Sequence, residues 1–133
     1  MEQKRVGGGK SERVQRVRQV SSKPTQAPPK RIKVGYLDIR VDSSPQAVLR
    51  SYINDSEVVF GRYDERQGVI TLSTDAHPAV VRETLVHEIL HAIIKQFAPP
   101  MEDDEEERMV RYLSAPLYAT ISQNKELVKF LMS

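Results

Sequence analysis

The chain has 133 residues, the length of a single domain, and its composition excludes several kinds of site. It contains no cysteine, so disulfides and thiolate zinc sites are excluded, and a bound metal would need histidine and carboxylate ligands. No apolar run approaches the ~20 residues that span a bilayer, and residues 1–10 lack the apolar core of a secretion signal. We therefore expect a cytoplasmic protein that does not enter a membrane.

The net charge of +2 conceals two segments of opposite charge. Residues 1–33 carry ten Lys and Arg residues against two acidic ones, whereas residues 34–133 carry ten against sixteen. Three consecutive glycines, three prolines and few apolar residues predict that residues 1–30 form a disordered basic arm, followed by a folded domain over residues 31–133. Such an arm can make weak contacts with nucleic acid phosphates, and it can equally be a solubilising tail without a partner.

The folded domain is predicted to begin with a β-strand and a short helix. Apolar residues alternate along residues 32–41, which is the period of a strand. Ser43 and Ser44 precede Pro45, an order typical of a helix cap followed by proline in the first turn. We therefore expect a helix over residues 46–53.

A β-hairpin is predicted next. Residues 57–63 and 69–73 are rich in β-branched and aromatic residues, and the five residues between them end in Gly68. Glycine can supply the left-handed backbone conformation that a tight turn needs. Two or three strands are thus expected before the helical half of the chain.

The longest predicted helix follows this hairpin. Asp75 or His77 can cap a helix that has Pro78 near its first position. The helix should end at about Phe97, before Pro99, because proline cannot continue it.

Two more helices are expected after it. One should begin inside the acidic run of residues 102–107, because carboxylates stabilise a helix N-terminus through the helix dipole. Pro116 should kink or break that helix, since proline lacks a backbone N–H. Residues 126–131 are predicted to form a short amphipathic helix. The expected fold class is therefore α+β, with a small N-terminal sheet followed by helices.

Three residues in the middle of the longest predicted helix are the candidates for metal binding and catalysis: His87, Glu88 and His91. Histidines four residues apart lie one turn apart on one face of a helix, so both rings can bind one zinc ion at ~2.0–2.1 Å. Zinc lowers the pKa of a water that it binds to near 7, and Glu88 could accept the proton of that water and pass it to a leaving amine. Two partly buried structural histidines are the competing interpretation, but a glutamate between them favours the metal site.

This His-Glu-x-x-His segment resembles the active-site helix of zincin metallopeptidases. Residues 63–130 are similar to small phage and bacterial metallopeptidases related to the ImmA/IrrE and SprT-like groups. The resemblance implies a zincin-like fold, a proteolytic role in a bacterial or phage-infected cell, and a further metal ligand from a second helix. The SprT-like pattern includes a histidine downstream of the motif, and this chain has none after His91.

A catalytic zinc site needs a third protein ligand. A downstream histidine is excluded, so a carboxylate from the next helix is expected, as in the glutamate-type zincins and the ImmA/IrrE pattern. Glu107 is the preferred ligand because its spacing from the apolar positions of that helix places it near the inner face. Glu106 is the alternative, and Asp103, one turn earlier and shorter, ranks third.

Several other residues have weaker claims to a role. Tyr112 or Tyr118 could donate a hydrogen bond to an oxyanion, although tyrosines at this spacing more often belong to the core. Asp75 could orient a metal-bound histidine. His77 is expected to be a helix cap or a surface residue.

The predicted function is zinc-dependent hydrolysis of peptide bonds, with zinc as the cofactor and a protein or peptide as the substrate. Two alternatives stay open on sequence alone. One is a non-catalytic zinc protein that binds nucleic acid through residues 1–33. The other is a zinc hydrolase that cleaves a non-peptide amide at the same site.

Overall fold

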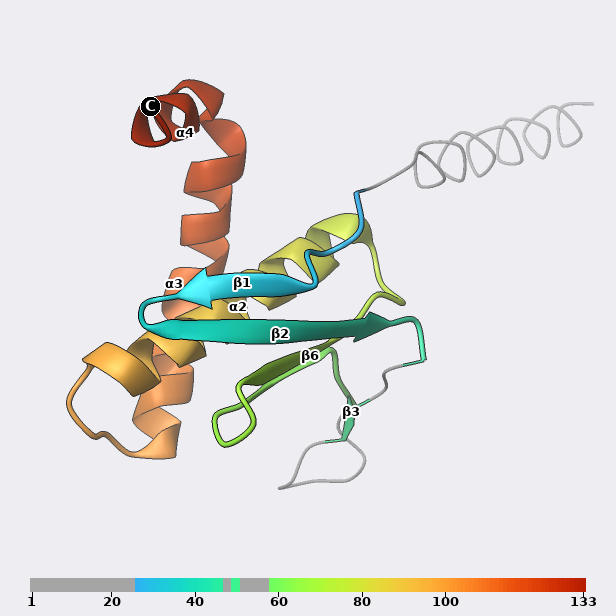
Figure 1. The fold of residues 1–133 in the computed structure, drawn as a ribbon, viewed down its shortest axis with the longest axis vertical. Coiled ribbons are helices and arrows are strands. Elements are labelled where there is room, and N and C mark those ends of the chain that lie inside the picture. The colour runs from blue at the N-terminus through green and yellow to red at the C-terminus, as the bar shows by residue number, and fades with distance from the viewer. Residues whose placement is uncertain (1–25, 47–48, 51–57) are drawn as a thin grey trace, which may run out of the picture.

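A computed structural model describes residues 26–46, 49–50 and 58–133, and it has the predicted α+β architecture (Figure 1). The strands are β1 (Arg31–Val34), β2 (Leu37–Ser44), β3 (Leu49–Arg50), β4 (Val58–Val59), β5 (Gly61–Asp64) and β6 (Val69–Ser73). The helices are α2 (Pro78–Phe97), α3 (Asp103–Gln123) and α4 (Lys125–Leu131). Most of the predicted basic arm, residues 1–25, lies outside the described residues.

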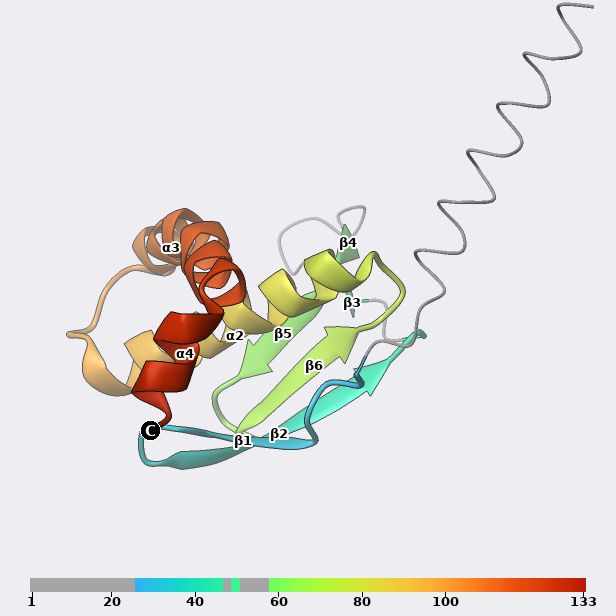
Figure 2. The ribbon, with the colours of Figure 1, turned by 90° about the horizontal axis from the view of Figure 1, so that it is seen from above.

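The main sheet has four strands in the order β1-β2-β6-β5. Strands β2 and β6 are parallel, whereas β1 pairs with β2 and β5 pairs with β6 in antiparallel fashion. Side chains alternate across the sheet, so one face gathers the fully buried residues Ile39, Ile70 and Leu72. Helix α2 lies across this face (Figure 2) and contributes Ala92 to the same core. The predicted motif helix therefore packs directly on the sheet.

The prediction of a single strand over residues 32–41 is wrong, and so is the expected total of two or three strands. Gly35 has φ = 59° and forms a turn that separates β1 from β2. A Cβ atom at Gly35 would lie 2.5 Å from the ring of Phe97, so this position also needs glycine for close packing. Apolar and polar residues alternate along both strands of this hairpin. The sequence therefore shows one nearly continuous alternation, which does not reveal the turn.

The predicted helix over residues 46–53 is also wrong where it can be tested. Leu49–Arg50 is strand β3, which pairs with β4 in a second, two-stranded sheet. The rest of that range beyond Gln46 lies outside the described residues. The hydroxyl of Ser44 accepts a hydrogen bond from the backbone N–H of Gln46 at 3.1 Å, so serine before proline marks a turn here.

The predicted hairpin is confirmed as β5–β6, but the single strand predicted over residues 57–63 is wrong, because that range divides into β4, which pairs with β3 in the second sheet, and β5, which begins at Gly61. Gly68 adopts φ = 65° in its turn. The carboxylate of Asp64 accepts hydrogen bonds from the backbone N–H groups of Arg66 and Gln67, at 2.9 and 3.2 Å, and fixes the turn locally.

The three helices predicted after the hairpin are confirmed as α2, α3 and α4, but the break predicted at Pro116 is not. His77 caps α2 by accepting a hydrogen bond from the N–H of Ala79 on its Nδ1 atom, at 3.1 Å. The predicted break at Pro116 does not occur, because α3 continues to Gln123. The hydroxyl of Thr120 donates to the Pro116 carbonyl at 2.8 Å, within the turn that follows the proline. No helix in the described ranges is long and apolar enough to cross a membrane.

Gly61 allows α2 to approach the edge of the sheet. A Cβ atom at this position would lie 2.6 Å from Cγ2 of Thr84 and 3.2 Å from Cγ of Glu88. We therefore expect Gly61→Ala to lower the free energy of unfolding by about 2 kcal/mol, because the overpacked strand must move away from the helix. Gly68→Ala is the control, since nothing lies within 4 Å of its Cβ position and only backbone strain is added. Urea unfolding curves compare the two variants, and a smaller loss for Gly61→Ala than for Gly68→Ala would contradict this packing.

Candidate metal centre

His87 and His91 lie one turn apart on α2 and face α3. Their ring centroids are 5.1 Å apart, with the planes inclined at 62°. The two side chains are 23% and 15% exposed, so the pair lies largely buried where α2 contacts α3. Burial lowers the pKa of His87, which favours the neutral ring that a metal requires, although the nearby Glu107 carboxylate acts in the opposite direction.

Glu107, on α3, bridges the two rings. One carboxylate oxygen lies 3.0 Å from Nε2 of His87, and the other lies 3.1 Å from Nε2 of His91. The three side chains can each offer one ligand atom such that all lie within 4.8 Å of one another. Ligand atoms that surround one tetrahedral ion at about 2.05 Å stand roughly 3.3 Å apart, so small adjustments would accommodate an ion. His87, His91 and Glu107 thus form a group that could hold a metal ion.

Glu106, the alternative zinc ligand suggested by the sequence, lies on the other side of the His91 ring from Glu107. Its Oε2 lies 2.7 Å from Nδ1 of His91, the ring nitrogen opposite the one that faces Glu107. Its Oε1 forms an ion pair with Nζ of Lys95 at 3.2 Å, and this hydrogen bond raises the pKa of Lys95. Glu106 is only 6% exposed. It therefore orients His91 from behind. Asp103 is not brought to the rings; its exposed carboxylate lies 3.9 Å from Lys95.

Ser114 plays the corresponding part behind His87, and sequence reasoning missed it. Its hydroxyl lies 3.2 Å from Nδ1 of His87 and donates its own hydrogen to the carbonyl of Val110. The serine oxygen is thus left to accept a hydrogen bond from Nδ1–H of the ring. The available signal was a small polar residue about one helical turn after Val110, on the apolar side of the predicted helix.

These contacts determine how the two imidazoles are presented. When Nδ1–H of His91 donates to Glu106 and Nδ1–H of His87 donates to Ser114, the Nε2 atom of each ring keeps a lone pair that can bind a metal ion. Both lone pairs then point at the carboxylate of Glu107, which is itself rich in lone pairs. Such an arrangement is unfavourable without a cation or a proton between the atoms, and it is the donor set that a metal ion needs.

Glu88 lies on the neighbouring face of α2, next to strand β5. It is 6% exposed, and burial raises its pKa to about 7, against opposing effects from His91 and from a backbone hydrogen bond with Tyr63. Gly61 makes room for its side chain. A buried carboxylate near neutrality can both accept and release a proton close to physiological pH.

The remaining candidate residues are not brought into the group. Tyr112 is 73% exposed, and the hydroxyl of Tyr118 accepts a hydrogen bond from Nε of Arg82 at 2.8 Å. Asp75 bonds through its backbone N–H to the Ser73 hydroxyl. Among the hydrogen bonds and ion pairs found between described residues, none joins Tyr112, Tyr118 or Asp75 to a ligand histidine.

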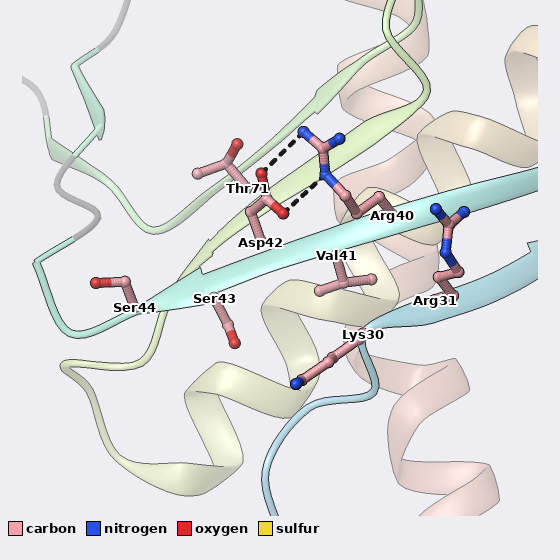
Figure 3. Close-up of a pocket in the computed structure, with 8 residues that line it drawn as sticks. All are labelled: Lys30, Arg31, Arg40, Val41, Asp42, Ser43, Ser44 and Thr71. Atoms are coloured by element: carbon pink, nitrogen blue, oxygen red, sulfur yellow. Dashed lines mark hydrogen bonds and ion pairs between the residues drawn. The ribbon is translucent and has the colours of Figure 1, made fainter.

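A wide pocket lies away from this group, along β1 and β2 (Figure 3). It has a volume of about 800 Å³, and three of its eight lining residues are basic: Lys30, Arg31 and Arg40. Arg40 is neutralised by Asp42, to which it donates two hydrogen bonds of 2.9 and 3.1 Å. None of the metal-binding candidates lines this pocket.

In comparisons with known proteins, no family model, curated protein or solved structure matches the chain.

Proposed function

We propose that this protein is a zinc-dependent metallopeptidase of the zincin type. The observation that carries the proposal is the convergence of two imidazole Nε2 atoms and one carboxylate on a common point, within 4.8 Å of one another. His87, His91 and Glu107 are the proposed zinc ligands, and Glu88 is the proposed general base. The α+β fold, with a short sheet ahead of the motif helix, supports this assignment.

The donor set favours zinc among the divalent metals. Two neutral imidazoles and one carboxylate are a common ligand set of catalytic zinc, which keeps its fourth position open for water or substrate. Magnesium and calcium prefer sites made of oxygen atoms alone. The hydrogen bonds from His91 to Glu106 and from His87 to Ser114 fix the ring orientations that such a site requires.

The proposed ligands and Glu88 have separate roles in hydrolysis. Zinc, when bound, supplies a Lewis acid that lowers the pKa of water and polarises a carbonyl. The Glu88 carboxylate accepts the proton of the attacking water and delivers it to the amide nitrogen that leaves. Burial of Glu88 between α2 and β5 keeps bulk water from competing for that proton.

A stoichiometric assay tests the proposed function directly. The purified chain should bind one zinc per molecule and cleave an unstructured protein such as reduced casein, and an excess of chelator should abolish cleavage. A panel of non-peptide amides separates a peptidase from an amidase with the same site. Tight zinc binding without turnover of any of these substrates would contradict the peptidase assignment.

Glu106 should control metal affinity without being a ligand. We expect Glu106→Gln to weaken zinc binding about tenfold to a hundredfold, because a neutral amide holds Nδ1–H of His91 less strongly and makes its Nε2 a poorer donor. Asp103→Asn is the matched control, since it removes one charge beside the same Lys95 but touches neither ring. Competition with a chromogenic chelator gives both affinities, and equal values for the two variants would contradict the role of Glu106.

Weak nucleic acid contact through residues 1–33 and a cytoplasmic location stay predictions. Within the described residues, Lys30, Arg31 and Lys33 continue the positive charge of the arm onto β1, and Asp38 lies 3.8 Å from Arg31. An affinity for DNA or RNA that falls steeply with salt would support the contact.

A further inference from the structure

Lys95 contacts the carboxylate that orients one of the proposed zinc ligands. It lies one helical turn after His91 on α2, and its Nζ atom is 3.2 Å from Oε1 of Glu106. The other oxygen, Oε2, lies 2.7 Å from Nδ1 of His91. The Glu106 carboxylate therefore lies between a lysine ammonium and a proposed zinc ligand, with one oxygen on each.

Among the described residues, three carboxylates lie within 4.0 Å of the Lys95 ammonium, and they differ in burial. Asp103 at the start of α3 and Glu65 in the β5–β6 turn lie 3.9 and 4.0 Å from Nζ, and their side chains are 97% and 62% exposed. Exposed ion pairs of this length are screened by water and contribute little. The Glu106 side chain is only 7% exposed, so its shorter contact is the least screened of the three. Lys95 therefore acts chiefly on Glu106.

The ammonium stabilises the Glu106 carboxylate in its buried position beside the His91 ring. A buried carboxylate without a counter-ion is strongly unfavourable, so without Lys95 the side chain would turn toward water. This change would remove the oxygen that accepts the hydrogen of Nδ1, and the ring could then carry its hydrogen on Nε2 instead. A neutral ring in that form has no free lone pair on Nε2 and cannot bind a metal ion there.

We propose that Lys95 is a positioning residue of the proposed zinc site: its ammonium fixes the Glu106 carboxylate, which holds the His91 ring with Nε2 free for the ion. This inference rests on the proposed function, because it assumes that Nε2 of His91 binds zinc. Lys95 also brings a positive charge toward the ion, which alone would weaken binding. Glu106 lies between the two and neutralises that charge, so the loss of orientation outweighs the removal of the charge.

Zinc affinities of variants at residue 95 test this role. We expect Lys95→Met to weaken zinc binding about tenfold, at the lower end of the effects of residues that orient metal ligands. Lys95→Arg should keep the affinity within about threefold of that of the unmodified protein, because a guanidinium can also bind the carboxylate. Glu65→Gln is the control, since it removes only an exposed carboxylate 4.0 Å from Lys95. Competition with a chromogenic chelator gives the affinities, and a Lys95→Met protein that binds zinc as tightly as the unmodified protein would overturn the proposal.

The position of the hydrogen on His91 distinguishes orientation of the ring from a general loss of stability. Nitrogen NMR of the metal-free protein with neutral rings separates a ring nitrogen that carries hydrogen from one that does not. His91 should carry its hydrogen on Nδ1 in the unmodified protein, and Lys95→Met should shift it toward Nε2. His77 is the internal reference, because its Nδ1 accepts a hydrogen bond from Ala79 and its hydrogen therefore stays on Nε2 in both proteins. If Lys95→Met does not fold, Lys95→Gln, which also removes the charge, replaces it in both measurements.

The two measurements separate this inference from the proposed function. An unmodified chain that binds no zinc would refute the metallopeptidase assignment, while the hydrogen position on His91 would still show whether Lys95 orients the ring. A chain that binds zinc, but whose zinc affinity and His91 spectrum do not respond to the loss of the Lys95 charge, would refute the role of Lys95 alone.

Discussion

Replacing Glu88 by Gln should lower peptide cleavage by about two to four orders of magnitude while one zinc per chain is retained. The amide has the size of the carboxylate and fits the same space beside Gly61, but it cannot accept a proton. Glu88 is not among the three residues whose ligand atoms converge, so its loss should not affect metal content. Initial rates with saturating zinc, together with elemental analysis of the purified variant, give both quantities.

The same replacement at Glu126 is the control for this experiment. Glu126 lies exposed in the first turn of α4, and Glu126→Gln should leave both cleavage and zinc content unchanged. If Glu88→Gln cleaved peptides at the rate of the unmodified protein, Glu88 would not be the base. If it lost its zinc, the carboxylate would belong to the metal site instead.

Replacing His91 by Ala should weaken zinc binding by about three orders of magnitude and abolish cleavage. The variant loses one of the three proposed ligands and leaves Glu106 and Glu107 without their shared partner. Zinc at a thousandfold excess over its dissociation constant stabilises a folded protein by about 4 kcal/mol. Thermal unfolding with and without zinc should therefore show a large upward shift for the unmodified protein and almost none for His91→Ala.

His77→Ala is the control that shows whether the zinc-dependent shift in thermal unfolding requires a ligand histidine or is lost with any histidine. His77 is the only histidine outside the motif, and it caps α2 through its Nδ1 atom. Its replacement should cost about 1 kcal/mol of stability, as the loss of a helix cap usually does, and should preserve the zinc-dependent shift. The account would fail if His77→Ala removed that shift or if His91→Ala kept it.

Helices α2, α3 and α4 could be predicted from the sequence because their signals are local. Pro78, the cap at His77 and the prolines after Phe97 define α2 within the chain itself. The same holds for the relation of His87 to His91, since the helix repeat alone places them on one face. The turn at Gly35 could not be predicted, because the alternation continues through it and its glycine is required partly by contact with Phe97, far along the chain.

The choice between Glu106 and Glu107 depends on tertiary packing. The two residues are adjacent, and either one could face α2 according to the spacing of the apolar positions. The way α3 lies on α2 turns Glu107 toward both Nε2 atoms and buries Glu106 behind His91, where Lys95 compensates its charge. Lys95 and Ser114 could not be assigned roles from the sequence. Their roles depend on which nitrogen of each histidine ring faces Glu107 and which faces away from it, and this depends on tertiary packing.

Anomalous diffraction at the zinc edge, from crystals of the chain grown with zinc, tests the central claim most directly. We predict a single strong peak at about 2.0–2.1 Å from Nε2 of His87 and from Nε2 of His91, with a carboxylate oxygen of Glu107 at a similar distance. Zinc bound only elsewhere, or a Glu107 side chain turned away from an ion held by the two histidines, would contradict it.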